Sequence, residues 1–259
     1  MIPQKIVLVG TGNVASHLAG ALGRKLTAIV GRDTGKACML AQKNGIPFSG
    51  DTSVIRDIKP DMLILSIADN ALPSVAAGIG QLPGTPLTVH TSGTIAKEVL
   101  DTISPRTGVL YPLQTFSKDV YVDMHSVPFF TEAASPGDLA AIDSLARSIS
   151  GTVHHADAAS RQLLHIAGVF SSNFVNILLE IVGDILGQGN YPLSTVRPLV
   201  EATVAKAFEA GPHNAQTGPA RRGDKSVIDK HIAALPHDKG QIYRLLSEYI
   251  INSHKVSLK

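Results

Sequence analysis

The chain has 259 residues, a length that suits one large domain or two of ordinary size. Its composition, 44% hydrophobic and 17% charged with a formal net charge of +2, is that of a soluble globular protein. The basic residues are too scattered for a nucleic-acid-binding face, and the single cysteine, Cys38, excludes an internal disulfide and fits a reducing compartment.

The N-terminal residues run directly into a strand-like segment and lack the features of a signal peptide. The most apolar later stretch, residues 163–186, contains polar residues that a membrane span would tolerate poorly, among them His165, Glu180 and Asp184. We therefore interpret this stretch as a buried helix and expect a cytoplasmic protein with no membrane partner.

The first 155 residues alternate apolar strand-like runs with helical stretches, which is typical of a parallel sheet covered by helices. Runs such as 6–9 and 62–65 are apolar at every position, as strands in the middle of a covered sheet must be. The predicted strands are 5–10, 26–31, 62–67, 87–90, 107–111, 127–131 and 152–155, and the early helices are 13–23, 34–44, 52–57 and 71–79.

After His155 the pattern becomes entirely helical. Asp157 can cap a helix whose apolar positions recur at helical spacing as far as residue 185, a helix of roughly 30 residues and about 45 Å. Further helices are predicted at 194–210, 224–235 and 238–254, with an irregular segment at 211–223. We predict a sheet domain over residues 1–155 and an all-α domain over residues 156–259.

A glycine turn joins the first strand to the first helix, the place of the phosphate-binding turn in Rossmann-type, doubly wound α/β domains. Gly10 permits the turn, Gly12 lets the backbone approach a pyrophosphate, and Ala15 allows close packing of the helix. Alone, the pattern fits any tight strand-to-helix turn, but its setting predicts a dinucleotide site. The predicted cofactor contacts in this turn are Gly10, Thr11, Gly12, Asn13 and Val14.

The tip of the second strand bears on which dinucleotide is bound. NAD enzymes usually place an acidic residue there for the ribose 2′-hydroxyl, but this tip carries Arg32, whose guanidinium suits a 2′-phosphate. Asp33 comes one position late and could instead cap the next helix. We predict NADP, with NAD less favoured.

Two further strand ends should frame the cofactor, since ligands of doubly wound sheets bind beyond the carboxyl ends of the strands. Asp69 either binds there or caps the helix that begins at Ala71. The remaining predicted cofactor contacts are Ser66, Ile67 and Ala68 on the adenosine and ribose side and Thr91 near the nicotinamide ribose.

The chain resembles the 6-phosphogluconate dehydrogenase-like oxidoreductases, and within them the Rossmann-like NADP oxidoreductases whose C-terminal helical domain has no known function. The segments that match are VGTGNVASHL, VHTSG, GVLYPLQTF, HIAGVFSSNF and TGPARRGD, with His231 shortly after. The resemblance implies a 6-phosphogluconate dehydrogenase-like C-terminal domain, a homodimer through that domain and a substrate cleft between the domains. It implies no particular substrate.

The long helix carries the main catalytic candidates, His165 and Asn173, which lie eight residues apart and so on nearly the same face. In relatives such as hydroxyisobutyrate dehydrogenase this helix supplies a proton-donating lysine and an orienting asparagine, but here no lysine lies between Lys118 and Lys206. His165 is the substitute, because an imidazole exchanges protons near neutral pH. Alternatively, it is a hydrogen-bonded histidine of the domain interface.

Other candidates for substrate contact lie outside the helix. Ser92 could donate to the reacting oxygen, and Gln114 could hydrogen-bond substrate. Arg222 lies in a Pro- and Gly-rich loop and could hold a carboxylate or phosphate, although the arginine pair could equally hold the dimer together. Asp224 is placed to cap the next helix. No metal site is predicted, since His154 and His155 have no other ligand at suitable spacing.

These residues predict an NADP-dependent oxidoreductase that transfers a hydride to or from a small, anionic carbonyl, imine or alcohol substrate. His165 would be the acid/base, with Asn173 and Ser92 orienting the substrate. Two alternatives remain open: a non-catalytic NADP-binding sensor, and an imine reductase of the pyrroline-5-carboxylate type that does not need His165.

Overall fold

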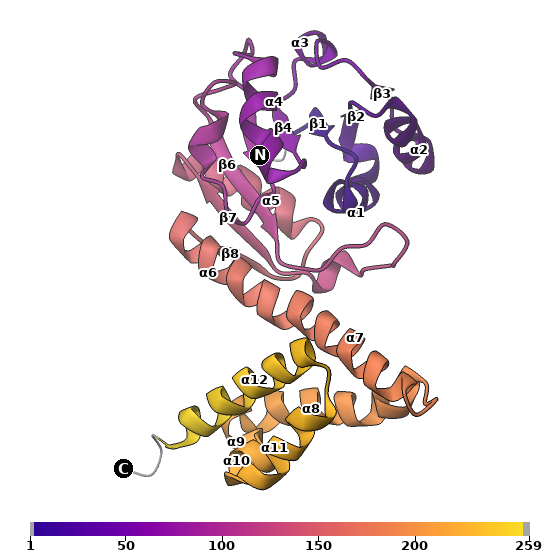
Figure 1. Ribbon diagram of the computed structural model, residues 1–259. Coiled ribbons are helices and arrows are strands. Elements are labelled where there is room, and N and C mark those ends of the chain that lie inside the picture. The colour runs from indigo at the N-terminus through magenta and orange to yellow at the C-terminus, as the bar shows by residue number, and fades with distance from the viewer. Residues whose placement is uncertain (1–2, 256–259) are drawn as a thin grey trace. The chain divides into compact units, whose positions relative to one another are not determined.

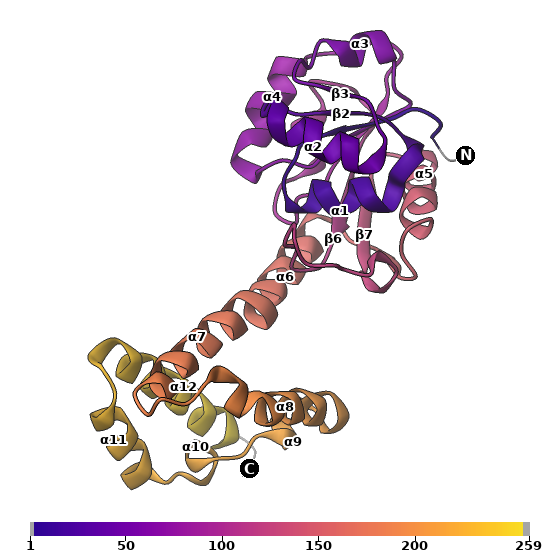
Figure 2. The same ribbon diagram turned by 90° about the vertical axis from the view of Figure 1, so that its right-hand side faces the viewer.

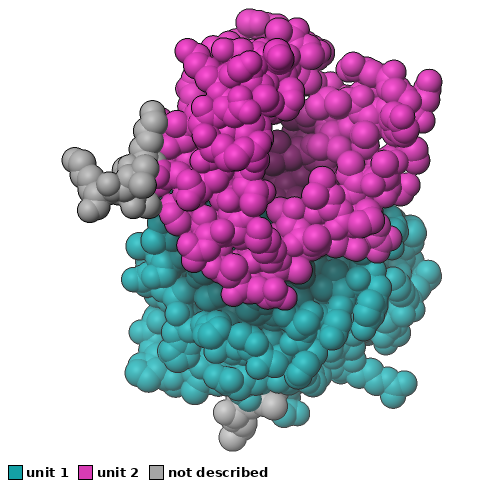
Figure 3. Space-filling view, turned by 90° about the horizontal axis from the view of Figure 1, so that it is seen from below, with its two compact units in different colours: residues 1–173 teal, residues 174–259 magenta. Residues whose placement is uncertain are grey.

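The computed structural model describes residues 3–255 and divides into two compact units, residues 1–173 and 174–259, which Figure 3 colours separately. The contacts group the first half of the long helix with the sheet. Residue 155, where we predicted the domain boundary, is the last residue of the sheet. The division into domains 1–155 and 156–259 stays a prediction. Each unit is described by itself below.

Unit 1 is built on an eight-stranded sheet with the order β3-β2-β1-β4-β5-β6-β7-β8. This order confirms the predicted doubly wound fold, since the chain builds outward from β1 first on one side and then on the other. The strands are β1 (Ile6–Val9), β2 (Leu26–Val30), β3 (Phe48–Ser49), β4 (Met62–Leu65), β5 (Leu87–His90), β6 (Thr107–Pro112), β7 (Phe129–Ala133) and β8 (Val153–His155).

All neighbouring strands are parallel except β6 and β7, which are antiparallel. A parallel pairing needs a crossover connection, usually a helix, but the chain between β6 and β7 has only the 3-10 turn Met124–Ser126. The strand therefore returns in the opposite direction. The parallel sheet predicted from the sequence therefore contains one antiparallel pairing.

Helices cover both faces of the sheet, and Figures 1 and 2 show their course. Along β1, Ile6 and Leu8 belong to one apolar core and Val7 and Val9 to the other, because successive side chains of a strand point to opposite faces. The helices of this unit are α1 (Asn13–Leu22), α2 (Thr34–Asn44), α3 (Val54–Ile58), α4 (Leu72–Ile79), α5 (Pro136–Arg147) and α6 (Ala158–Gly168).

Two of these elements were not predicted. β3 is only two residues long, too short for a periodic pattern. Helix α5 has clear start signals, since the Ser135 side chain accepts a hydrogen bond from the Asp138 amide and Pro136 occupies the first helical position. The sequence therefore contained enough information to find α5.

The long helix runs continuously over Ala158–Gly187, as predicted, and Asp157 caps it by accepting from the Ser160 amide. It comprises α6, a π-helical turn at Val169–Asn173 and α7 (Phe174–Gly187). By length and composition alone it could cross a membrane, but its charged and polar residues argue against a span. The prediction that this helix is buried is wrong, since Leu163 is 69% exposed and Phe170 is 64% exposed.

As far as residue 255, unit 2 contains helices and turns but no strand, as predicted. The segment 211–223, predicted to be irregular, forms two single helical turns, each with a proline at its first position after a glycine of positive φ, Gly211 or Gly218. Besides α7, its helices are α8 (Arg197–Ala210), α9 (Pro212–Ala215), α10 (Pro219–Arg222), α11 (Lys225–Ala234) and α12 (His237–Lys255). Asp224 caps α11 through the Val227 amide, which confirms that prediction.

Candidate functional site

A pocket of about 590 Å³ lies at the carboxyl ends of β1, β2, β4 and β5. This is the point where the strand order reverses around β1, the usual ligand site of a doubly wound sheet. The predicted cofactor residues all line this nucleotide pocket, together with Ser92: Gly10, Thr11, Gly12, Asn13, Val14, Arg32, Ser66, Ile67, Ala68 and Thr91.

The glycine turn forms the floor of the nucleotide pocket. Gly10 has a φ of +125°, and a Cβ there would lie 2.0 Å from the Ser66 carbonyl oxygen, so no other residue fits. At Gly12 a Cβ would meet no described atom within 4 Å, so the space beside its backbone is open to a ligand. Because α1 begins at Asn13, its first amide groups have no partner within the helix. This cradle fits a pyrophosphate.

The tip of β2 leaves only one side chain available for a ribose phosphate. Asp33 caps α2 through the Lys36 amide at 3.0 Å and forms an ion pair with the Lys36 ammonium at 2.9 Å. These hydrogen bonds, first from the amide and then from the side chain, lower the pKa of the Asp33 carboxyl. The capping role considered for Asp33 is therefore confirmed, and Arg32 lies exposed in the pocket wall beside it.

The tips of β4 and β5 are tied to each other by hydroxyl groups. The Thr91 hydroxyl donates to the Ser66 hydroxyl oxygen at 3.2 Å, and the Thr94 hydroxyl donates to the Asp69 carboxylate at 2.6 Å. The Ser92 hydroxyl oxygen accepts from the amides of Thr94 and Ile95, both at 3.1 Å. Ser92 is thus rigidly held. The alternative role of Asp69 as a helix cap is wrong, because its carboxylate faces Thr94 instead.

His165 lies half-buried on α6 beside this loop. Its Nδ1 atom is 3.3 Å from the Tyr111 hydroxyl oxygen of β6. Gly93, the residue after Ser92, lies against both rings, since a Cβ on it would come within 2.8 Å of Tyr111 Cζ and 3.1 Å of His165 Nδ1. The fold therefore brings His165 next to the end of the nucleotide pocket that Ser92 lines.

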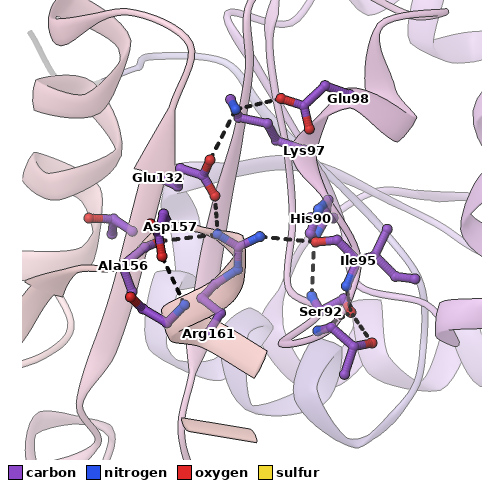
Figure 4. Close-up of polar contacts among 12 residues, drawn as sticks. His90, Ser92, Ile95, Lys97, Glu98, Glu132, Ala156, Asp157 and Arg161 are labelled. Atoms are coloured by element: carbon purple, nitrogen blue, oxygen red, sulfur yellow. Dashed lines mark hydrogen bonds and ion pairs between the residues drawn. The ribbon is translucent and has the colours of Figure 1, made fainter. Parts of the chain in front are cut away.

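One turn before His165, a buried arginine fixes α6 to the sheet (Figure 4). Arg161 is fully buried, forms an ion pair with Glu132 of β7, and donates to the carbonyl oxygens of Ala156 at 3.1 Å and Ile95 at 3.0 Å. Glu132 also accepts from Lys97 at 3.0 Å. Because Ile95 belongs to the Ser92 loop, Arg161 sets the position of His165 relative to that loop. The sequence analysis missed this residue, although an arginine at the start of an apolar helix is a usable signal.

His90, at the end of β5, is also fully buried, and its Nδ1 accepts from the Ser92 amide at 3.2 Å. Its Nε2 has no hydrogen-bond partner among the described residues. Burial first, and then the charge of Arg161, lower the pKa of His90 to about 4. The imidazole is therefore neutral at physiological pH, and we interpret it as a support for the Ser92 loop. The sequence analysis placed His90 at this strand end but did not assign it that role.

Besides His165, three predicted site residues do not line the nucleotide pocket: Gln114, Asn173 and Arg222. Gln114 is exposed, does not line the nucleotide pocket, and accepts from the Thr115 amide at 2.8 Å. Arg222 belongs to unit 2 and is exposed on α10. Asn173 is the last residue of the π-helical turn, which holds more residues than an α-helical turn. The eight residues from His165 to Asn173 therefore make roughly two full turns, which keeps the two residues on nearly the same face of the helix. The roles proposed for these side chains stay predictions.

The fold also pairs two residues that sequence spacing did not connect. His155 Nε2 lies 2.7 Å from the carboxylate of Asp143 on α5, which also accepts from the Thr131 hydroxyl. Within residues 3–255, however, no group of three or more histidine, cysteine or acidic side chains is placed to hold a metal ion.

A larger pocket, of about 1070 Å³, lies between α1, α2 and the segment 118–125. It shares Thr11 and Lys36 with the nucleotide pocket but contains none of the strand ends that carry polar groups. We therefore assign the candidate site to the smaller pocket, because the polar groups at the strand ends line that pocket.

Comparison with known proteins agrees with this geometry. Residues 127–250 match a family model described as a domain of unknown function, DUF2520. A crystal structure of a "putative NADP oxidoreductase" from Bacteroides fragilis is 36% identical, with a TM-score of 0.88, covering 96% of this chain and 98% of that one. No protein of curated description matches the sequence.

Two more distant structures show the fold alone. A 1-pyrroline-5-carboxylate reductase from Streptococcus pyogenes is 14% identical with a TM-score of 0.65, covering 96% of this chain and 98% of that one. A reductive aminase from Aspergillus terreus, in complex with NADPH and ethyl-5-oxohexanoate, is 14% identical with a TM-score of 0.71, covering 96% and 94%.

Proposed function

Since the chain belongs to the family of Rossmann-fold NADP oxidoreductases that carry the DUF2520 domain, we propose that it is an NADP-dependent oxidoreductase of small carbonyl, imine or alcohol substrates. The observation that carries the proposal is the position of His165, which lies against Gly93 at the end of a pocket shaped for a dinucleotide. A proton-exchanging group is thus placed beside the loop that the nicotinamide end of a cofactor would reach.

Different residues of the nucleotide pocket bind different parts of the cofactor. The amides that open α1 bind the pyrophosphate, and Arg32 binds the 2′-phosphate. When bound, NADPH supplies the hydride for reduction. The chain's own part in the chemistry is carried by His165, which exchanges the proton, and by Ser92 and Asn173, which orient the substrate. Arg222 binds an anionic group of the substrate.

Turnover tests this function directly. Purified protein is incubated with NADPH and a panel of small carbonyl compounds and cyclic imines, and the loss of NADPH absorbance is followed. We expect at least one class of substrate to accelerate the loss. Tight NADPH binding without turnover on any compound would support the sensor alternative instead.

Replacing Arg32 by alanine should weaken NADP binding by roughly 10- to 100-fold, because a charge-assisted phosphate contact contributes about 1.5 to 3 kcal/mol. NAD, which lacks the 2′-phosphate, should bind within about twofold of its wild-type affinity. Calorimetric titration of both dinucleotides measures the difference, with Arg24→Ala, an exposed arginine outside the pocket, as the matched control. Equal loss of affinity for both dinucleotides would contradict the assignment of Arg32.

We further propose that the chain is a homodimer through its helices. Among the described residues of unit 2, only two apolar side chains are buried, those of Ala220 and Ile228. Phe208, by contrast, is 89% exposed. Such a unit lacks a core of its own, and a second copy would bury the exposed apolar residues. Sedimentation equilibrium should give a dimer, and a monomer at micromolar concentration would refute the proposal. The apolar side chains concerned include Phe174, Ile177, Leu199, Phe208 and Leu245.

A further inference from the structure

We propose that Tyr111 is a positioning residue for His165: it occupies the Nδ1 atom of the imidazole, so that Nε2 is the atom that exchanges the proton with the substrate. The inference rests on the proposed function, in which His165 exchanges the proton; Tyr111 sets which nitrogen of that imidazole does so. It follows from three elements that meet at one point, the loop after β5, the end of β6 and helix α6.

Tyr111 is held firmly by the sheet. It is only 8% exposed and pairs with Phe130 of β7 in the antiparallel ladder, with ring centroids 6.4 Å apart. Its hydroxyl oxygen lies 3.3 Å from His165 Nδ1, and the two ring centroids are 6.3 Å apart. Because Tyr111 is paired with Phe130 of β7, and β6 also pairs with β5 as far as Val109, the hydroxyl has little freedom to leave the imidazole.

Gly93 provides the space in which the two rings meet. A Cβ at this position would lie 2.8 Å from Tyr111 Cζ, closer than real side chains approach, and 3.1 Å from His165 Nδ1. A second close contact joins the same elements, since a Cβ on Gly168 of α6 would lie 3.1 Å from the Leu113 side chain. The end of β6 and the helix thus fit together at two successive turns, which fixes the orientation of the imidazole.

The phenol can partner both protonation states of the imidazole. Burial first, and then the nearby charge of Asp69, raise the pKa of Tyr111, so its hydroxyl stays protonated. The hydroxyl oxygen accepts a hydrogen bond from Nδ1–H of the imidazolium, and it still accepts from Nδ1–H of the neutral ring that remains once Nε2 has given up its proton. Tyr111 therefore keeps Nδ1 engaged in either state.

With Nδ1 engaged, proton exchange is confined to Nε2. During reduction, Nε2 of the imidazolium gives its proton to the reacting oxygen or nitrogen while Nδ1–H stays bonded to the Tyr111 oxygen. The ring is then neutral, and Nε2 takes up a proton from water to restore the starting state. In the oxidation direction the same proton moves the other way.

The test compares Tyr111→Phe, which keeps the ring and removes the hydroxyl, with the wild-type chain. The ¹⁵N resonances of His165 are recorded on the full-length protein without cofactor or substrate, and they should show a changed Nδ1 shift in the variant. With any substrate that turns over, kcat should fall roughly three- to tenfold while KM for NADPH stays within about twofold. Tyr121→Phe, an exposed tyrosine of the same unit, is the matched control and should change neither readout.

A second variant, Gly93→Ala, tests the same contact from the other side. Its methyl group would lie too close to the Tyr111 ring and tightly against His165, so a ring or the loop must shift, and the same Nδ1 resonance should change. Unchanged ¹⁵N resonances in both variants would overturn the proposal, as would changed resonances with an unchanged kcat. If no substrate turns over, the proposed function fails, and the ¹⁵N spectra still decide whether Tyr111 engages Nδ1.

Discussion

Replacing Arg161 by methionine should lower the free energy of unfolding by about 3 kcal/mol, the low end of the cost of breaking a buried ion pair. The side chain is 0% exposed, whereas that of its partner Glu132 is 18% exposed. Methionine fills much of the space but leaves two carbonyl oxygens without donors and part of the Glu132 carboxylate uncompensated. Lys97, which also pairs with Glu132, limits the loss.

Urea unfolding followed by circular dichroism measures this effect. The matched control is Arg197→Met, because Arg197 pairs with Glu201 on an exposed helix surface and should contribute less than about 1 kcal/mol. The double variant Arg161→Met with Glu132→Leu should recover part of the loss, since no carboxylate is then left unpaired. A loss below about 1 kcal/mol in the single variant would show that Arg161 does not anchor α6.

Replacing His165 by alanine should lower kcat by roughly a hundredfold to ten-thousandfold, the usual effect of removing a general acid or base. NADPH affinity should stay within about twofold, because His165 does not line the nucleotide pocket. Steady-state kinetics with the best substrate, together with a binding titration, separate the two effects. His237→Ala, an exposed histidine of unit 2, is the control. Undiminished kcat on cyclic imines would instead favour an imine reductase that needs no charged donor.

Local patterns in the sequence predicted most of the fold. The glycine turn, Arg32 and the strand ends were all assigned from residues within a few positions of one another, and the structure brings them together in one pocket. Caps such as Asp157 and Asp224 were found for the same reason, since a cap involves residues only three positions apart. Helix α5 was missed although its signal was equally local.

The contacts that hold the candidate site in place could not be predicted from local patterns in the sequence. Tyr111 and His165 are 54 residues apart, and Arg161 and Glu132 are 29 apart. No periodicity connects such pairs, because they meet only where neighbouring strands and a packed helix bring them together. The direction of β7 and the π-helical turn were likewise outside the reach of local patterns.

The sequence by itself therefore determined the doubly wound sheet, the helical second half and the place of the dinucleotide pocket, because hydrophobic period and turn chemistry act over short spans. Only the tertiary structure decided which side chains surround and support His165. It placed Tyr111 against His165 and buried Arg161 against Glu132, since burial and charge pairing depend on contacts between distant segments.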